Sequence, residues 1–149
     1  RMGSLGMHIA NIARRRHPEV AVTGPVREQF QELAAAVLTM TGETCQVLSA
    51  PEEDLAYELA AEDDAVDEMN QAILTAVTSE KWKYSTREAV DAAMLSRYYE
   101  RIADHCVSIA ARITYQFTGT TAEEEAEEFA TPGSDAEIVR RMKRLTDPR

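Results

Sequence analysis

Two pairs of carboxylates in the sequence have a spacing that suits metal chemistry. Asp63 and Asp67 are four residues apart, and so are Glu100 and Asp104. In a helix this spacing places both side chains of a pair on one face, so pairs from two adjacent helices can bridge cations. Oxygen ligands without thiolates suit Mg²⁺, Ca²⁺, Mn²⁺ or iron ions. On the residues alone, a solvated acidic face is the favoured interpretation.

Residue types that carry catalysis do not form a recognisable motif in this sequence. No His follows a Glu by three residues, as in di-iron bundles, and there is no Gly-rich phosphate loop or GxSxG elbow. Cys45 and Cys106 form no CxxC, so neither a zinc knuckle nor a disulfide framework is indicated. His105 is interpreted as a half-buried or surface histidine rather than as an additional ligand. We therefore expect a protein that is not an enzyme.

The charge of the chain is unevenly distributed. Its 149 residues include 16 Lys or Arg and 26 Asp or Glu, a formal charge of −10. Residues 28–80 hold 13 of these acids and no Lys, Arg or His, which leaves the remainder at +3. An acidic protein is poorly suited to nucleic acid, whose phosphates select a basic surface. This acidic tract is interpreted as a mostly solvated face that also attracts basic partners.

Composition indicates a folded, soluble protein. Hydrophobic residues make up 44% of the chain, which has only five Pro and six Gly, so a collagen-like or mainly disordered chain is excluded. No apolar run approaches the ~18 residues that a membrane span needs, and we expect no membrane insertion. The cysteine usage and the lack of a recognisable export signal predict a cytoplasmic location.

Hydrophobic periodicity predicts helices and no strands. A first helix over residues 1–16 is ended by Pro18, and longer helices are predicted over about 25–48, 51–79 and 85–118. Short turns between the long helices favour antiparallel neighbours. The predicted fold is therefore all-α, an antiparallel three-helix bundle preceded by a separate helix.

The last long helix has the clearest signals. Ser85-Thr86-Arg87-Glu88 is a capping box, which satisfies backbone donors at a helix start. An apolar stripe with 3,4,4,3,4,4 spacing follows, formed by Leu95, Tyr98, Ile102, Cys106, Ile109, Ile113 and Phe117. We take this stripe as the core face, so Glu100 and Asp104 are expected to point away from the core.

The segment SRYYERIADHCVSIA at residues 96–110, with Thr118-Gly119 after it, resembles the PhoU family. Members are cytoplasmic accessory proteins of high-affinity phosphate uptake, made of two similar three-helix bundles. The resemblance extends to Asp63-Asp64-Ala65-Val66-Asp67 and to residues 1–10. It implies that residues 1–18 are the last helix of a first bundle and residues 25–119 a second bundle. Residues 120–149 are expected to be an acidic linker and a short basic amphipathic helix.

A weak internal repeat agrees with this division. Residues 1–13 align with residues 101–113 at an offset of 100, with identities such as Ile9 and Ile109. If the two segments are equivalent, the chain begins inside a structural unit. We therefore expect a fragment that lacks most of an N-terminal repeat, and the alternative is that Arg-Met-Gly-Ser comes from a cloning vector.

The resemblance also implies a metal site. Members of the family carry (Glu/Asp)-x-x-x-Asp motifs on adjacent helices, and in some of them these motifs hold iron or zinc clusters. The matching residues here are Asp63, Asp67, Glu100 and Asp104. Iron, zinc or another divalent ion is thus the expected cofactor, if there is one. In the first bundle Ser4 aligns with Asp104, so that half lacks the pattern.

The function that the resemblance implies is regulatory. It is that of an adaptor between the ATPase of a phosphate ABC transporter and a sensor histidine kinase, which it restrains when phosphate is plentiful. Similarity to the family also implies a homodimer. Two alternatives remain open at this point: a helical scaffold unrelated to phosphate and, less favoured, a carboxylate-bridged di-metal enzyme.

Overall fold

The computed structural model describes residues 1–50 and 53–118, and within these ranges the chain is helical with no strand. The helices are α1 (Met2–Arg16), α2 (Arg27–Ser49), α3 (Glu53–Thr78) and α4 (Thr86–Thr118), with a 3₁₀ turn η1 (Gly24–Val26) before α2. The prediction of an all-α fold is confirmed. The predicted linker and tail helix in residues 120–149 lie outside the described residues.

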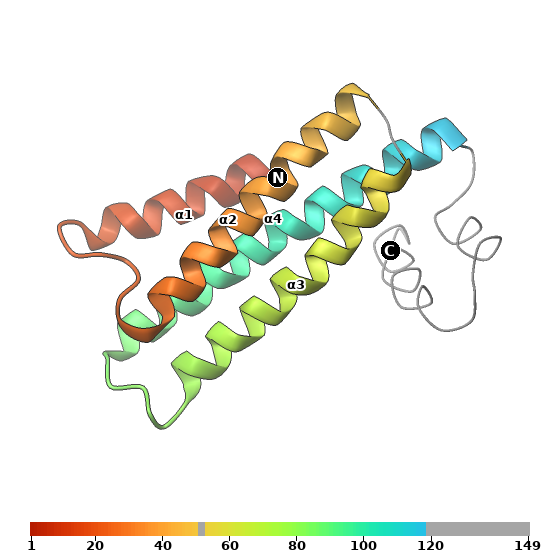
Figure 1. Cartoon of the computed structure of the whole chain (residues 1–149). Coiled ribbons are helices and arrows are strands. Elements are labelled where there is room, and N and C mark those ends of the chain that lie inside the picture. The colour runs from red at the N-terminus through yellow and green to blue at the C-terminus, as the bar shows by residue number, and fades with distance from the viewer. Residues whose placement is uncertain (51–52, 119–149) are drawn as a thin grey trace, which may run out of the picture.

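Helices α2, α3 and α4 form a three-helix bundle in which α3 runs opposite to the other two (Figure 1). Helix α1 lies along α4, and α4 is the helix of the bundle that it contacts. Each helix begins and ends close to its predicted boundaries. Pro18 follows the end of α1, and Gly24-Pro25 starts the next helical turn. No helix in the described part of the chain is long and apolar enough to cross a bilayer.

The hydrophobic core lies where the three bundle helices meet. α2 and α3 turn apolar side chains inward at intervals of three, four or seven residues, as amphipathic helices do. Side chains with almost no exposure include Leu33, Met40, Val47, Leu59, Val66 and Ile73. This core fixes the rotation of α3 about its own axis, and with it the direction of its acidic side chains.

Helix α4 presents only part of the predicted stripe to the centre of the bundle. Its buried face is made mostly of small residues, with Ala92, Ser96, Ala103 and Ala110 at 2% exposure or less. From this face Ser96 bonds to Asn70 of α3. Small side chains let the neighbouring helices approach α4 closely, so this face makes most of the contact with α2 and α3.

The predicted stripe is split between two sides of α4. Cys106 and Leu95 are buried, whereas Tyr98, Ile102 and Ile113 are only partly buried. Tyr98 stacks on His8 of α1 with ring centroids 5.1 Å apart, so this side of α4 is covered by α1. The prediction that Glu100 points away from the core is therefore wrong: Glu100 lies toward the bundle and is 7% exposed.

Candidate functional site

A polar seam runs along the contact between α3 and α4. We use "polar seam" for Asp63, Asp67 and Asn70 of α3 with Ser96, Glu100 and Asp104 of α4. The Ser96 hydroxyl donates a hydrogen bond to Asn70 Oδ1, which fixes the register of the two antiparallel helices. Because both helices rise equally per residue, Asp67 then lies level with Glu100, and Asp63 level with Asp104. All four predicted metal ligands thus belong to one seam.

Glu100 is the most confined carboxylate of α4. Its Oε1 bonds to Arg97 of the same helix, while its buried Oε2 has no hydrogen-bond partner among the described residues. Burial raises the pKa of Glu100, and the carboxylates of Asp104 and Asp67 raise it further, against the opposing effect of Arg97. A buried carboxylate oxygen beside two other carboxylates favours either a bound proton or a bound cation.

Asp63 lies deeper than the other three predicted ligands. It is fully buried, and its charge contributes to the raised pKa of the Cys106 thiol, for which burial is the largest cause. The Cys106 sulfur in turn lies 4.0 Å from the Thr41 hydroxyl of α2. Asp63 is therefore directed into the bundle centre, on the side of α4 that also faces α2.

The structure brings three predicted ligands together more closely than the fourth. The charges of Asp67 and Asp104 both raise the pKa of Glu100, whereas the charge of Asp63 raises the pKa of Cys106. Within residues 1–50 and 53–118, no group of three or more His, Cys, Asp or Glu side chains has an arrangement suited to a metal ion. The donor chemistry fits a hard cation, but these side chains would have to converge further to bind one.

His105 is half-buried, next to the polar seam. Burial lowers its pKa, and the charge of Arg101 lowers it further, against the effect of Asp104. A neutral imidazole at neutral pH is consistent with the interpretation of His105 as a partly buried side chain.

A carboxyl pair between α2 and α3 was not predicted from the sequence. The carboxyl groups of Glu43 in α2 and Glu62 in α3 lie close enough to share a hydrogen bond when Glu62 is protonated. Burial raises the pKa of Glu62 to about 7, helped by the bond to Glu43 and by the charges of Glu43 and Glu58. The i,i+4 spacing of acids on α3 indicates crowded carboxylates in the sequence. It does not identify Glu43 as the partner of Glu62, because that contact depends on how α2 and α3 are aligned.

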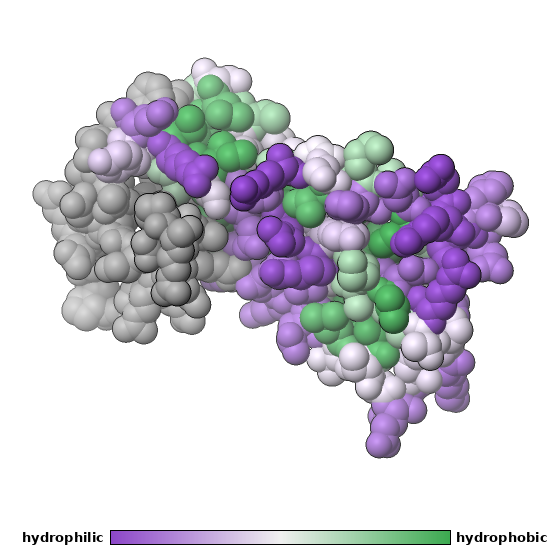
Figure 2. All heavy atoms as spheres, turned by 180° about the vertical axis from the view of Figure 1, so that it is seen from behind, coloured by the Kyte–Doolittle hydropathy of each residue, from purple (hydrophilic) through white to green (hydrophobic). Residues whose placement is uncertain are grey.

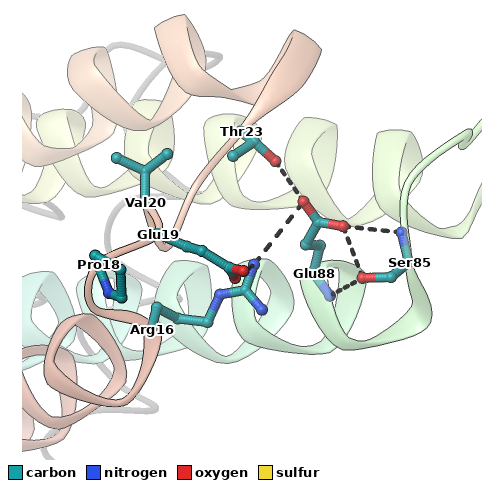
Figure 3. A pocket seen from close by; sticks show the side chains of 7 residues that line it. All are labelled: Arg16, Pro18, Glu19, Val20, Thr23, Ser85 and Glu88. Atoms are coloured by element: carbon teal, nitrogen blue, oxygen red, sulfur yellow. Dashed lines mark hydrogen bonds and ion pairs between the residues drawn. The ribbon is translucent and has the colours of Figure 1, made fainter.

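A second unpredicted cluster joins the end of α1 to the start of α4 (Figure 3). We call it the Glu88 clasp, formed by Arg16, Thr23, Ser85 and Glu88. The predicted capping box is its centre, because the Ser85 N–H donates to Glu88 Oε2 at 2.9 Å and the Glu88 N–H donates to Ser85 Oγ at 3.2 Å. Thr23 donates to the other carboxylate oxygen at 2.8 Å, and the Arg16 guanidinium lies 3.9 Å from it.

The clasp lines a surface hollow together with Pro18, Glu19 and Val20. The bonds from Ser85, followed by that from Thr23 and the charge of Arg16, lower the pKa of Glu88 to about 2. Both carboxylate oxygens of Glu88 are engaged, one in capping α4 and the other in contacts with Thr23 and Arg16. The hollow is therefore a structural joint, and the polar seam remains the candidate functional site.

A family profile described as PhoU domain matches residues 30–113, from α2 to α4. The phosphate-specific transport system accessory protein PhoU homolog 2 of Mycobacterium tuberculosis is 38% identical over 119 residues, covering 80% of this chain and 56% of that protein. PhoU homolog 1 of Mycobacterium leprae is 34% identical over 134 residues, covering 90% and 59%. The chain thus spans little more than half the length of these relatives. No solved structure matches significantly.

Proposed function

The chain belongs to the PhoU family, and on this premise we propose that it is a regulator of phosphate uptake and of the response to phosphate starvation. In this proposal it works without catalysis, in the cytoplasm and as a homodimer. It contacts the ATPase of a phosphate ABC transporter and a sensor histidine kinase, and it restrains the kinase when phosphate is plentiful.

One observation carries the proposal: the match to the PhoU domain spans the bundle, from Phe30 in α2 to Ile113 in α4. The related mycobacterial proteins are named as accessory proteins of phosphate-specific transport. The acidic tract over residues 28–80 supplies a surface that can attract basic partner segments and increase association rates.

Pull-down tests this role. The chain is immobilised and presented with the transporter ATPase and the kinase of its own organism, at low and at high salt. We expect both to be captured at low salt, less at high salt, and less by the Glu58→Gln/Glu68→Gln variant, which neutralises two exposed acids of α3. Failure to capture either protein, or unchanged expression of phosphate-starvation genes after deletion of the locus, would contradict the proposal.

We also propose that the polar seam binds a divalent metal such as iron or zinc, with Asp67, Glu100 and Asp104 as ligands and Asp63 behind them. The orphaned buried oxygen of Glu100 supports this, because a cation would supply the interaction that this oxygen lacks. A metal here would join α3 to α4 and offset most of the negative charge of the three carboxylates.

Metal loading tests the seam. After dialysis against Fe²⁺ or Zn²⁺, the parent is expected to retain metal, and the Asp104→Ala and Glu100→Gln variants to lose most of it. Glu68→Gln is the matched control, since Glu68 is an exposed acid of the same tract outside the seam. Equal metal content in the parent and Asp104→Ala, measured by mass spectrometry, would disprove the site.

A further inference from the structure

The side of α4 that neither the bundle nor α1 covers carries a regular row of side chains. We call it the outer row, and its members are Arg87, Val90, Met94, Arg97 and Arg101. Their spacing of three, four, three and four residues places them on one face of the helix. Val90 is 55% exposed and Met94 44% exposed, and the side chain of Arg97 is 53% exposed. The row spans roughly 21 Å, at 1.5 Å per residue.

The carboxylates of the same stretch of α4 are turned away from the outer row. Glu88 is held in the clasp by Ser85 and Thr23. Asp91 is 9% exposed, and its Oδ2 lies 3.8 Å from Nε of Arg16 in α1. Glu100 is directed into the bundle and is 7% exposed, although its Oε1 also bonds to Arg97 of the row. Between residues 87 and 101 the exposed face is consequently basic at its two ends and apolar in its centre.

This arrangement differs from the charge patterns of α1 and α3. Helix α3 has eight acids and no basic residue, whereas α1 has three Arg in its last turn and no acid. Seen from behind relative to Figure 1, the surface shows hydrophobic side chains interspersed among strongly hydrophilic ones (Figure 2). An exposed apolar pair flanked by arginines is a recognisable docking pattern, since the apolar pair supplies burial and the arginines supply orientation.

We propose that the outer row of α4 is a docking site for an acidic amphipathic helix of a partner protein. The apolar side of that helix covers Val90 and Met94, and acids on its two flanks meet Arg87 at one end and Arg97 with Arg101 at the other. Charge complementarity identifies the partner as acidic, and the short linear span of the row fits about four turns of helix. The proposal concerns the chemistry of the partner and does not depend on a role in phosphate regulation.

A protein helix suits the row better than an anionic bilayer does. The exposed apolar side chains of the row are only two, whereas a membrane-binding face needs a broad apolar area. A partner helix contacts a narrow line of residues, which matches the shape of the row.

Fluorescence anisotropy tests the proposal with a labelled synthetic helical peptide of roughly 15 residues. The peptide carries two central Leu four positions apart with Glu on both flanks, and a second peptide has Lys in place of each Glu. We expect the parent to bind the acidic peptide, less at high salt, and not the basic one. The Arg87→Glu variant and the Val90→Ser/Met94→Ser variant are each expected to weaken binding by about tenfold.

Two control variants match these changes elsewhere on the surface. Leu38→Ser removes an apolar side chain of α2 that is 72% exposed, and Arg27→Glu reverses an exposed charge at the start of α2. Both are expected to bind within about twofold of the parent. Thermal unfolding checks the fold, and Arg87→Glu is expected to fold normally because an acid in the first turn of a helix is favourable.

Four results would overturn the proposal: no binding of the acidic peptide, equal binding of the basic peptide, equal weakening by the control variants, or no loss in the outer-row variants. Two more would reassign the row to another occupant and so also overturn it. One is binding of phosphatidylglycerol vesicles that Arg87→Glu abolishes. The other is self-association in analytical ultracentrifugation that the same variant abolishes, which would make a second copy of the chain the occupant.

Discussion

At the scale of single residues, Glu62 is a carboxyl group whose pKa the fold moves into the neutral range. Its pKa is raised to about 7 by burial first, then by the hydrogen bond to Glu43 and the charges of Glu43 and Glu58. Protonated Glu62 can donate a hydrogen bond to the Glu43 carboxylate, whereas two ionised carboxylates side by side repel each other. The contact between α2 and α3 at this point is therefore strongest while the proton is bound.

This proton makes stability depend on pH. Because the folded pKa exceeds the ordinary value of 4.5, the stabilising contribution is complete below pH 4.5 and is lost as the pH rises through about 7. Screening by solvent at this partly exposed site limits the effect to about 1 kcal/mol. Urea unfolding should give a lower free energy of unfolding at pH 8 than at pH 5 for the parent. The decrease should be smaller for Glu62→Gln, whose amide keeps an N–H donor but does not titrate.

The matched control for this experiment is Glu68→Gln, on the exposed side of α3. It should leave the difference between pH 5 and pH 8 as large as in the parent. A Glu62→Gln protein with the same pH dependence as the parent would exclude the Glu43–Glu62 pair as its source.

Gly24 is the second residue with a specific requirement. Its φ of +65° is a left-handed conformation, and a Cβ built there would lie 2.4 Å from the ring of Tyr84. We expect Gly24→Ala to lower the free energy of unfolding by about 1–2 kcal/mol, mainly from backbone strain, because the exposed Tyr84 ring can move aside. Gly42→Ala is the control, because nothing lies within 4 Å of its Cβ position, and a helical Ala should stabilise by about 0.5–1 kcal/mol. Equal effects of the two changes in thermal unfolding would contradict this.

At the scale of elements, α4 is the helix that determines where the polar seam and the outer row lie. It meets α2 and α3 through small side chains, α1 through large ones such as Tyr98, and solvent through the outer row. Because the three faces are adjacent, a small rotation of α4 would expose Glu100 and bury part of the outer row. The packing of the small face is what prevents this rotation.

The small face gives a prediction for α4. Ala103 is fully buried where α4 meets the other bundle helices, so Ala103→Leu should overpack the contact and cost about 1–3 kcal/mol in unfolding free energy. Ala35→Leu on the exposed side of α2 should cost nearly nothing, since Ala and Leu have similar helix propensity. Denaturant titration measures both. A tolerated Leu at position 103 would mean that the helices do not approach as closely as described.

Features of the fold that depend on local sequence were the ones predicted correctly. The capping box of Ser85 and Glu88 and the stop at Pro18 involve only neighbouring residues, and periodicity identified each long helix. The burial of Glu100 was missed because α4 has two covered sides, and the large apolar residues mark the side facing α1. The Glu43–Glu62 bond was missed because it depends on the alignment of two helices, which periodicity does not determine.

At the scale of the whole molecule, the dominant feature is the separation of charge. The acidic tract of residues 28–80 carries no compensating base within itself, and the basic side chains of α1 and the outer row lie on other helices. Exposed ion pairs contribute little to stability, whereas repulsion among many like charges accumulates. The folded chain therefore contains unrelieved repulsion at low ionic strength.

Salt should accordingly stabilise the molecule. Raising the ionic strength from about 20 mM to about 200 mM shortens the screening length from roughly 20 Å to roughly 7 Å, which weakens repulsion within the acidic tract. We expect the melting temperature to rise by a few degrees in differential scanning calorimetry. A fall would show that attraction between opposite charges, as in the Glu88 clasp, outweighs the repulsion.

The three faces of α4 also constrain how this helix can change over evolutionary time. Positions such as Ala103 should accept almost no larger residue, while those facing α1, such as Ile102, should exchange one large apolar residue for another. The outer row is less constrained by packing, apart from Arg97, which bonds to Glu100, so variation there is limited mainly by what it binds. A family of such proteins can therefore diversify its partners at the outer row while keeping an unchanged bundle.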